Sequence, residues 1–184
     1  MNRDLLGQQR LYLAELLEAI QRSAFFLHAS EEKILWPLQG AFLSDQKKNT
    51  DLFETLAAIN ERFAKLQDSL AAAMRHSALL MSEPTDSFLK VLSFFEKHQV
   101  IDSITGWQRS RAARNLAAHD YEIDYAAIAE HFNHLHELSP LLYTTAGRLL
   151  NQCNQVLGIV PASDDFSAEF ARIAIVVRKT NSPG

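Results

Sequence analysis

The chain has 184 residues and a formal net charge of -4, a length that suits one domain with or without an appended segment. Hydrophobic residues make up 47%, which argues against a disordered chain, and 6 glycines and 5 prolines favour long helices over many short strands. The acidic balance argues against a surface that is basic all over, so any nucleic-acid site must be local.

Two features of the sequence bear on cellular location. The single cysteine, Cys153, cannot form an intrachain disulfide, which is typical of proteins in a reducing compartment. No apolar run approaches the roughly 20 residues of a membrane-spanning helix, and the start of the chain lacks the continuous apolar segment of a signal peptide. We therefore expect a soluble, cytoplasmic protein that does not contact membranes.

The first half of the chain predicts two long helices. Apolar residues spaced by three, four or seven positions predict the first over residues 3–28. Turn-forming residues then indicate a connection from 28 to 50, with a short helical turn over residues 31–36. Asp51 and Glu54 resemble a capping box, and the regular apolar pattern behind them predicts a second long helix that ends near Ser82.

Shorter helices are expected in the second half. Pro84 suits the first turn of a third helix, and Asp102 or Ser103 can cap a fourth. Asp124 can cap a fifth helix. Pro140 either opens a sixth helix or lies within one long helix that kinks there.

The segment after Gly158 is ambiguous. Pro161 and the acidic and hydroxyl residues behind it indicate a loop, whereas residues 170–177 are apolar and β-branched enough for either a helix or a strand. Apart from this tail, the patterns predict an all-α protein.

Chemically active side chains concentrate in one stretch, whose centre reads Arg-Asn-Leu-Ala-Ala-His-Asp-Tyr over residues 114–121. No Asp or Glu occurs from residue 103 to 119, while Arg109, Arg111 and Arg114 contribute a local charge of about +3. The planar fork of arginine suits phosphate, and His119 can exchange a proton near neutrality. Together with the hydroxyl of Tyr121, these groups could bind a phosphodiester and stabilise its transition state without a metal.

Helical geometry limits this interpretation. At about 100° per residue, Arg114 and His119 lie roughly 140° apart on a straight helix, so one helix cannot direct both side chains at one small target. They converge only if the helix ends near His119 or if a second subunit brings a second copy of the motif. A purely structural alternative also remains, because cationic side chains often cluster near a helix C-terminus, with Tyr121 and Trp107 as core aromatics.

The motif resembles the signature of the HEPN superfamily, in which Arg, often followed by Asn, precedes a His four residues further on and then a Tyr after one intervening residue. In this sequence those positions are Arg114, Asn115, His119 and Tyr121. Residues 62–68, Arg-Phe-Ala-Lys-Leu-Gln-Asp, are similar to the second helix of HepT-like members that pair with minimal nucleotidyltransferases. The resemblance covers roughly residues 51–150.

The resemblance implies an up-and-down bundle of four to five main helices over residues 1–157, followed by a tail over residues 158–184. It also implies a homodimer in which the two motifs face each other. Many members are toxins of toxin-antitoxin modules and act as metal-independent endoribonucleases. By position, Arg114 and His119 would be the catalytic pair, Asn115 a polar support, and Tyr121 a structural hydroxyl or the acceptor of AMP from a partner nucleotidyltransferase antitoxin.

Two functions therefore remain open. The first is a ribonuclease toxin without a cofactor, with RNA as substrate and with Arg109 and Arg111 as further phosphate ligands. The second is a non-catalytic substrate-binding partner of a nucleotidyltransferase that uses the same basic face and Tyr121. A helical dimer that retains the motif only for packing is a weaker third alternative.

A metal site formed by His131, His134 and His136 is less favoured than a solvated polar face. Their order matches neither the His-Glu-x-x-His motif nor its inverted form. Cys153 lies among apolar residues, so we expect it to be a small buried hydrophobic residue rather than a nucleophile.

Overall fold

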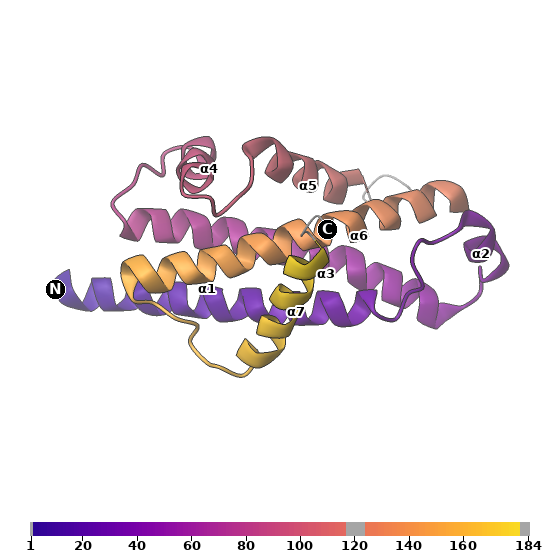
Figure 1. The fold of residues 1–184 in the computed structure, drawn as a ribbon, viewed down its shortest axis with the longest axis horizontal. Helices are drawn as coiled ribbons and strands as arrows, with labels where there is room; N and C mark the ends of the chain where they lie inside the picture. The colour runs from indigo at the N-terminus through magenta and orange to yellow at the C-terminus, as the bar shows by residue number, and fades with distance from the viewer. Residues whose placement is uncertain (1, 117–123, 181–184) are drawn as a thin grey trace.

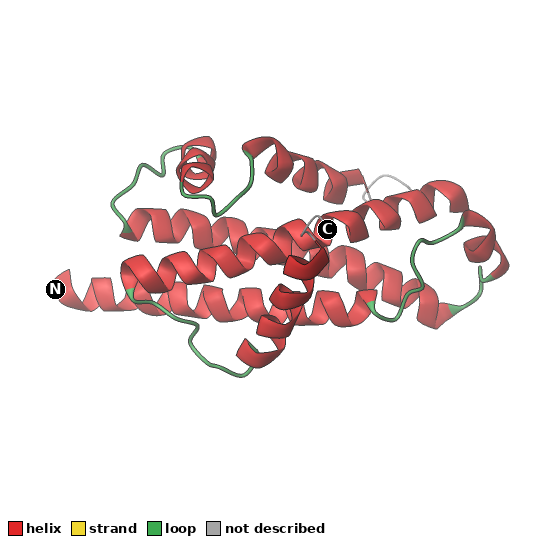
Figure 2. Ribbon diagram, viewed as in Figure 1, coloured by secondary structure: helices red, strands yellow, loops and turns green. Residues whose placement is uncertain are grey.

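The computed structural model describes residues 2–116 and 124–180 of the chain, and the side chains of residues 4–114 and 124–174. Within these ranges the protein is all-α and contains no strand, which confirms the predicted fold class (Figure 2). The helices are α1 (Asn2–Glu31), α2 (Gly40–Asp45), α3 (Thr50–Leu80), α4 (Phe88–Lys97), α5 (Ile104–Leu116), α6 (Tyr125–Gln152), the π-helical turn η1 (Cys153–Leu157) and α7 (Ser167–Thr180).

Three long helices, α1, α3 and α6, run along the long axis of the molecule and form its core (Figure 1). The apolar residues that predicted the first two helices are fully buried where α1 packs on α3, because side chains three or four positions apart share one helical face. They include Leu13, Leu17, Ile20 and Leu27 of α1 and Ile59, Phe63, Leu66 and Leu70 of α3. The two shorter helices α4 and α5 then cover one further side of α3.

Ser103 fixes the start of α5. Its hydroxyl accepts a hydrogen bond from the backbone N–H of Gly106 at 2.9 Å, as one of the two predicted caps was expected to do. The N–H of Ile104 is bonded in addition to the carboxylate of Glu96 on α4 at 2.8 Å. The first turn of α5 is therefore held both locally and by the preceding helix.

Two helix starts differ from the sequence prediction. The cap of α3 is Asn49, whose side chain accepts a hydrogen bond from the N–H of Leu52 at 3.1 Å, so Asp51 lies inside the first turn instead of capping it. Helix α4 begins after Ser87, whose hydroxyl accepts a hydrogen bond from the backbone N–H of Lys90. Pro84 lies before the helix. In both cases the cap is the residue with extended backbone dihedrals whose oxygen reaches the N–H three residues on.

Helix α6 is one continuous element from its cap at Asp124 to Gln152, with Pro140 inside it. Pro140 therefore does not open a new helix. Helix α6 packs against α1 and α3 along its length, and buried Leu138 and Leu142 flank the proline. This packing compensates for the backbone hydrogen bond that a proline removes.

The connection between α1 and α3 is tied to α6. Helix α1 extends to Glu31, and the short helix of this segment is α2, later in the chain than the predicted turn at residues 31–36. The amide of Asn133 bonds the backbone N–H and C=O of Leu38 at 2.7 and 3.0 Å. A Cβ at Gly40 would lie 2.7 Å from the backbone of Ala126, so only glycine permits this close approach of α2 to α6.

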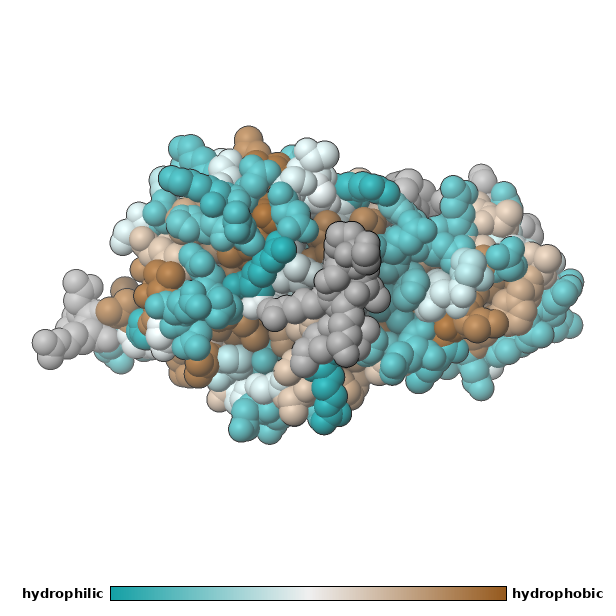
Figure 3. All heavy atoms as spheres, viewed as in Figure 1, coloured by the Kyte–Doolittle hydropathy of each residue, from teal (hydrophilic) through white to brown (hydrophobic). Residues whose placement is uncertain are grey.

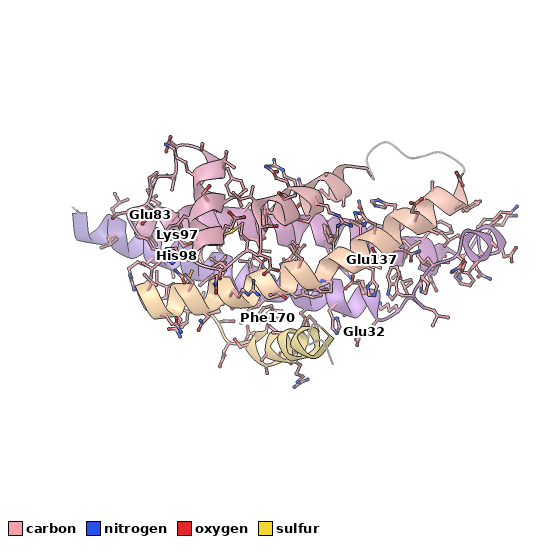
Figure 4. The ribbon with its side chains drawn as sticks, turned by 45° about the horizontal axis from the view of Figure 1, so that its top comes forward. Glu32, Glu83, Lys97, His98, Glu137 and Phe170 are labelled. Atoms are coloured by element: carbon pink, nitrogen blue, oxygen red, sulfur yellow. The ribbon has the colours of Figure 1, made fainter. Side chains whose placement is uncertain are left out.

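The C-terminal tail forms a helix, α7, which crosses α1 at a steep angle (Figure 1). Phe170 points from α7 toward the bundle (Figure 4) and is buried together with Ile173. Phe166 lies beside the rings of Phe25 and Phe26 at 5.7 and 6.2 Å. Phe166, Phe170 and Ile173 lie four and three residues apart, so they share the face of the helix that the bundle covers.

Candidate functional site

A groove opens where α3, α4 and α5 meet, and it contains two of the three arginines that the sequence singled out. Its volume is about 260 Å³. The lining residues are Gln67, Asp68, Ala71, Ala72 and Arg75 of α3, Phe88 of α4, and Trp107, Arg111 and Arg114 of α5. We call this the arginine groove.

The positions on α5 follow from helical spacing. Trp107, Arg111 and Arg114 lie four and three residues apart and so share one face of the helix. Trp107 is 2% exposed and anchors that face against α3 and α4, which places the two arginines at the rim of the groove. Arg109 is exposed and does not line it, because it lies about 200° around the helix from Trp107.

Arg75 is a groove residue that the sequence did not single out. Its guanidinium lies 5.6 Å from the centre of the Phe88 ring, in the geometry of a cation–π contact. Its spacing along α3 marks it only as a solvent-facing position. Because α3 and α5 come together only in the folded chain, no local sequence signal identifies Arg75 as a neighbour of Arg111.

One acid faces these three cations. Asp68 forms an ion pair with Arg114, whose guanidinium also lies 3.5 Å from the carbonyl oxygen of Ala64. The Asp68 side chain is 62% exposed and that of Arg114 is 23% exposed. An ion pair of this exposure contributes little to stability, so an anionic ligand can replace the carboxylate. The groove carries three positive charges and one negative charge.

The inner wall of the groove is polar but incompletely bonded. The Gln67 side-chain amide donates to the Ser110 hydroxyl at 2.7 Å, and that hydroxyl donates to the carbonyl of Trp107 at 2.8 Å. Within the part of the chain that the structure describes, the Gln67 carbonyl oxygen and the Trp107 indole N–H are buried without a hydrogen-bond partner. The chain of bonds through Ser110 fixes α5 against α3 and so fixes the spacing of the arginines.

The remaining motif residues cannot be placed beside this groove. His119 and Tyr121 lie outside the described residues, and so does the side chain of Asn115. The structure therefore brings together Arg111 and Arg114 of the motif and adds Arg75.

The histidines of α6 have different partners. His131 lies 3.4 Å from the amide oxygen of Asn60, His134 is near Glu137, and His136 is bonded to Glu31. No group of three or more His, Cys, Asp or Glu side chains is arranged to hold a metal ion in residues 4–114 and 124–174. Cys153 is fully buried, and burial raises the pKa of its thiol to about 11, which agrees with its expected structural role.

The fold and the site together define an all-α bundle with a cationic groove on one side. The chain matches no family model, no curated protein and no solved structure. None of the helices in the described ranges is long and apolar enough to cross a membrane.

Proposed function

We propose that this protein binds RNA and cleaves it as a metal-independent endoribonuclease, the toxin of a HEPN and minimal-nucleotidyltransferase toxin-antitoxin module. The observation that supports this proposal most directly is the arginine groove, where Arg75, Arg111 and Arg114 converge against one exposed carboxylate. Convergent arginines favour phosphodiesters because each guanidinium can donate two hydrogen bonds to one phosphate.

In the proposed mechanism, a phosphate of the RNA displaces Asp68 from Arg114 and is held between Arg114 and Arg111. The 2'-hydroxyl of the preceding ribose attacks the phosphorus, and the bond to the 5'-oxygen of the next nucleotide breaks. His119 acts as general acid or base and moves the proton lost by the 2'-hydroxyl or gained by the 5'-oxygen. The arginines stabilise the extra negative charge of the transition state, and the products carry a cyclic phosphate and a 5'-hydroxyl.

A homodimer completes the proposed site, with two motif stretches facing each other and Asn115 and Tyr121 as support. The tested quantity is the rate of RNA cleavage by the purified protein in excess EDTA. We expect His119→Ala and Arg114→Ala to lower the rate at least about a hundredfold, the scale of one general acid-base or charge-stabilising group, and Arg172→Ala on the surface of α7 to leave it unchanged. Equal rates for the wild type and His119→Ala would overturn the nuclease assignment.

A second candidate is a non-catalytic partner of a nucleotidyltransferase, which is supported by the same three arginines of the groove. In that function the basic face presents a substrate, or Tyr121 itself accepts AMP. Mass spectrometry of the protein produced together with a minimal nucleotidyltransferase tests it. A mass gain of one AMP on Tyr121, together with the absence of RNA cleavage, would replace the first candidate by the second.

A further inference from the structure

A second cationic site lies across α3 from the arginine groove, between α1 and α3. It has a volume of about 280 Å³ and is lined by Ala19, Arg22, Ser23 and Phe26 of α1 and by Arg62 and Lys65 of α3. We call it the α1–α3 pocket. The residues that line this pocket and the groove include six cationic side chains and one acid, Asp68. Outside the lining residues, Glu18 lies 4.0 Å from the guanidinium of Arg22.

An exposed aromatic ring lies within this cationic pocket. Phe26 is 42% exposed, and the guanidinium of Arg62 lies over it at 5.5 Å from the ring centre. Arg62 is held there by hydrogen bonds to the Ser30 hydroxyl and to the carbonyl of Phe26. An accessible ring beside fixed cations is the combination that proteins use to stack bases and bind the phosphates of a single strand.

The exposed ridge of α3 connects the two sites. Lys65, Asp68, Ala72 and Arg75 recur at three- and four-residue spacing and therefore form one stripe along the helix. Asp68 and Ala72 are exposed, and Ala72 has too short a side chain to obstruct a ligand that crosses the helix. From Lys65 to Arg75 the stripe is about 15 Å long.

We infer that a single strand of RNA crosses α3, with phosphates bound in both the arginine groove and the α1–α3 pocket and a base stacked on Phe26. This inference rests on the proposed function and assigns the path of the substrate outside the cleavage site. The path from Lys65 to Arg75 is about 15 Å long, so a strand that contacts both ends presents several phosphates to it. An RNA of about three nucleotides has only about two phosphates between its sugars and can contact only part of this path.

The test measures binding of fluorescent 2'-O-methyl RNA, whose blocked 2'-oxygen prevents cleavage, to the full chain at several salt concentrations. Strands of about three and about twelve nucleotides are compared. Arg22→Gln/Lys65→Gln removes two exposed cations of the α1–α3 pocket, and Phe26→Leu removes the ring but keeps an apolar side chain. The matched control is Lys47→Gln/Lys48→Gln, which makes the same charge change at two exposed lysines between α2 and α3.

For the long strand we expect the double variant to weaken binding at least about tenfold and to lower the salt slope by roughly 1.4, the share of two phosphate contacts. Phe26→Leu weakens it about tenfold through lost stacking. The loss is smaller for the short strand, and the control double variant shows none.

Three outcomes contradict the inference in different ways. If Arg111→Gln weakens binding of the long strand while Arg22→Gln/Lys65→Gln matches the control, the groove binds RNA and the path across α3 is wrong. If the wild type binds neither strand, both the path and the proposed function fail. Equal affinity for a polyaspartate chain of matched charge, with the same loss in Phe26→Leu, would assign the surface to an acidic protein segment and would also overturn the inference.

Discussion

At the scale of single residues, the buried carboxylate of Glu31 at the end of α1 contacts three polar side chains. It is 4% exposed and lies within hydrogen-bond distance of the Ser139 hydroxyl at 2.7 Å, the Tyr143 hydroxyl at 2.8 Å and His136 Nδ1 at 3.1 Å. His136 in turn stacks on Trp36. This network joins α1 to the middle of α6 and compensates for the burial of a charge.

The tyrosine in this network provides a pH test. Burial and then the negative charge of Glu31 raise the pKa of Tyr143 well above 10.0. An unfolded tyrosine ionises near pH 10, so the stabilisation from the neutral phenol is complete below that pH and is lost as the pH rises above it. We expect Tyr143→Phe to lower the free energy of unfolding by about 2 kcal/mol at neutral pH. Urea unfolding of the wild type and of Tyr143→Phe measures this difference in free energy.

The difference between the wild type and Tyr143→Phe should shrink above pH 10, because other groups that titrate there are common to both proteins. A difference that is constant from pH 7 to pH 11 would contradict the assigned hydrogen bond to Glu31. Tyr12→Phe serves as a control, since Tyr12 is 48% exposed.

Whether the sequence predicts a contact of this site depends on how far apart the two residues are along the chain. The face formed by Trp107, Arg111 and Arg114 follows from helical spacing. The same spacing turns Arg109 away from this face, although the sequence predicts Arg109 as a further phosphate ligand. Arg75 and the Glu31 network join residues that are tens to more than a hundred positions apart. A periodic pattern shows which residues share one helical face but not which helices pack together. These contacts can therefore be identified only in the folded structure.

At the scale of elements, the order and approximate extent of the long helices could be predicted because their buried faces repeat every three to four residues. Their starts were less predictable. Asp51 with Glu54 satisfies the capping-box pattern as well as Asn49 satisfies a simple cap, and only the backbone conformation distinguishes them. The helical nature of the tail depended on the bundle surface that covers Phe170.

The corrected start of α3 can be tested by two neighbouring substitutions. Asn49→Ala should lower the free energy of unfolding by about 1 kcal/mol, because it leaves the N–H of Leu52 without its acceptor. Asp51→Ala removes only a charge near the helix N-terminus and should cost about 0.5 kcal/mol or less. Thermal and urea unfolding measure both, and the opposite ranking would restore Asp51 as the cap.

Helix α7 should contribute to the stability of the whole bundle. Phe170 is 5% exposed and packs toward α1 and α6 (Figure 4), so Phe170→Ala should lower the free energy of unfolding by about 3 kcal/mol or more. Arg172→Ala on the exposed side of the same helix should change it by less than about 0.5 kcal/mol. If Phe170→Ala unfolds at the wild-type urea concentration, α7 is not part of the cooperative unit.

At the scale of the whole molecule, the surface is mixed and largely hydrophilic on the side shown in Figure 3, and the chain is acidic overall, with a net charge of -4. Attraction of a polyanion therefore depends on where the cations lie rather than on their number. Cations gather on both sides of α3, in the arginine groove and the α1–α3 pocket. Surface charges are screened within about 10 Å at moderate salt. RNA should therefore be attracted to the surface around the arginine groove and the α1–α3 pocket and not to the whole molecule.

Ultraviolet cross-linking of the full chain to 2'-O-methyl RNA shows whether the groove between α3 and α5 binds RNA. Phe88 and Trp107 line the groove, and mass spectrometry can locate the attached nucleotide. We expect cross-linked peptides from α3, α4 and α5, which are lost in Arg111→Gln and retained in Lys47→Gln/Lys48→Gln. Cross-links confined to α2 and α7, or unchanged in Arg111→Gln, would contradict RNA binding in the groove.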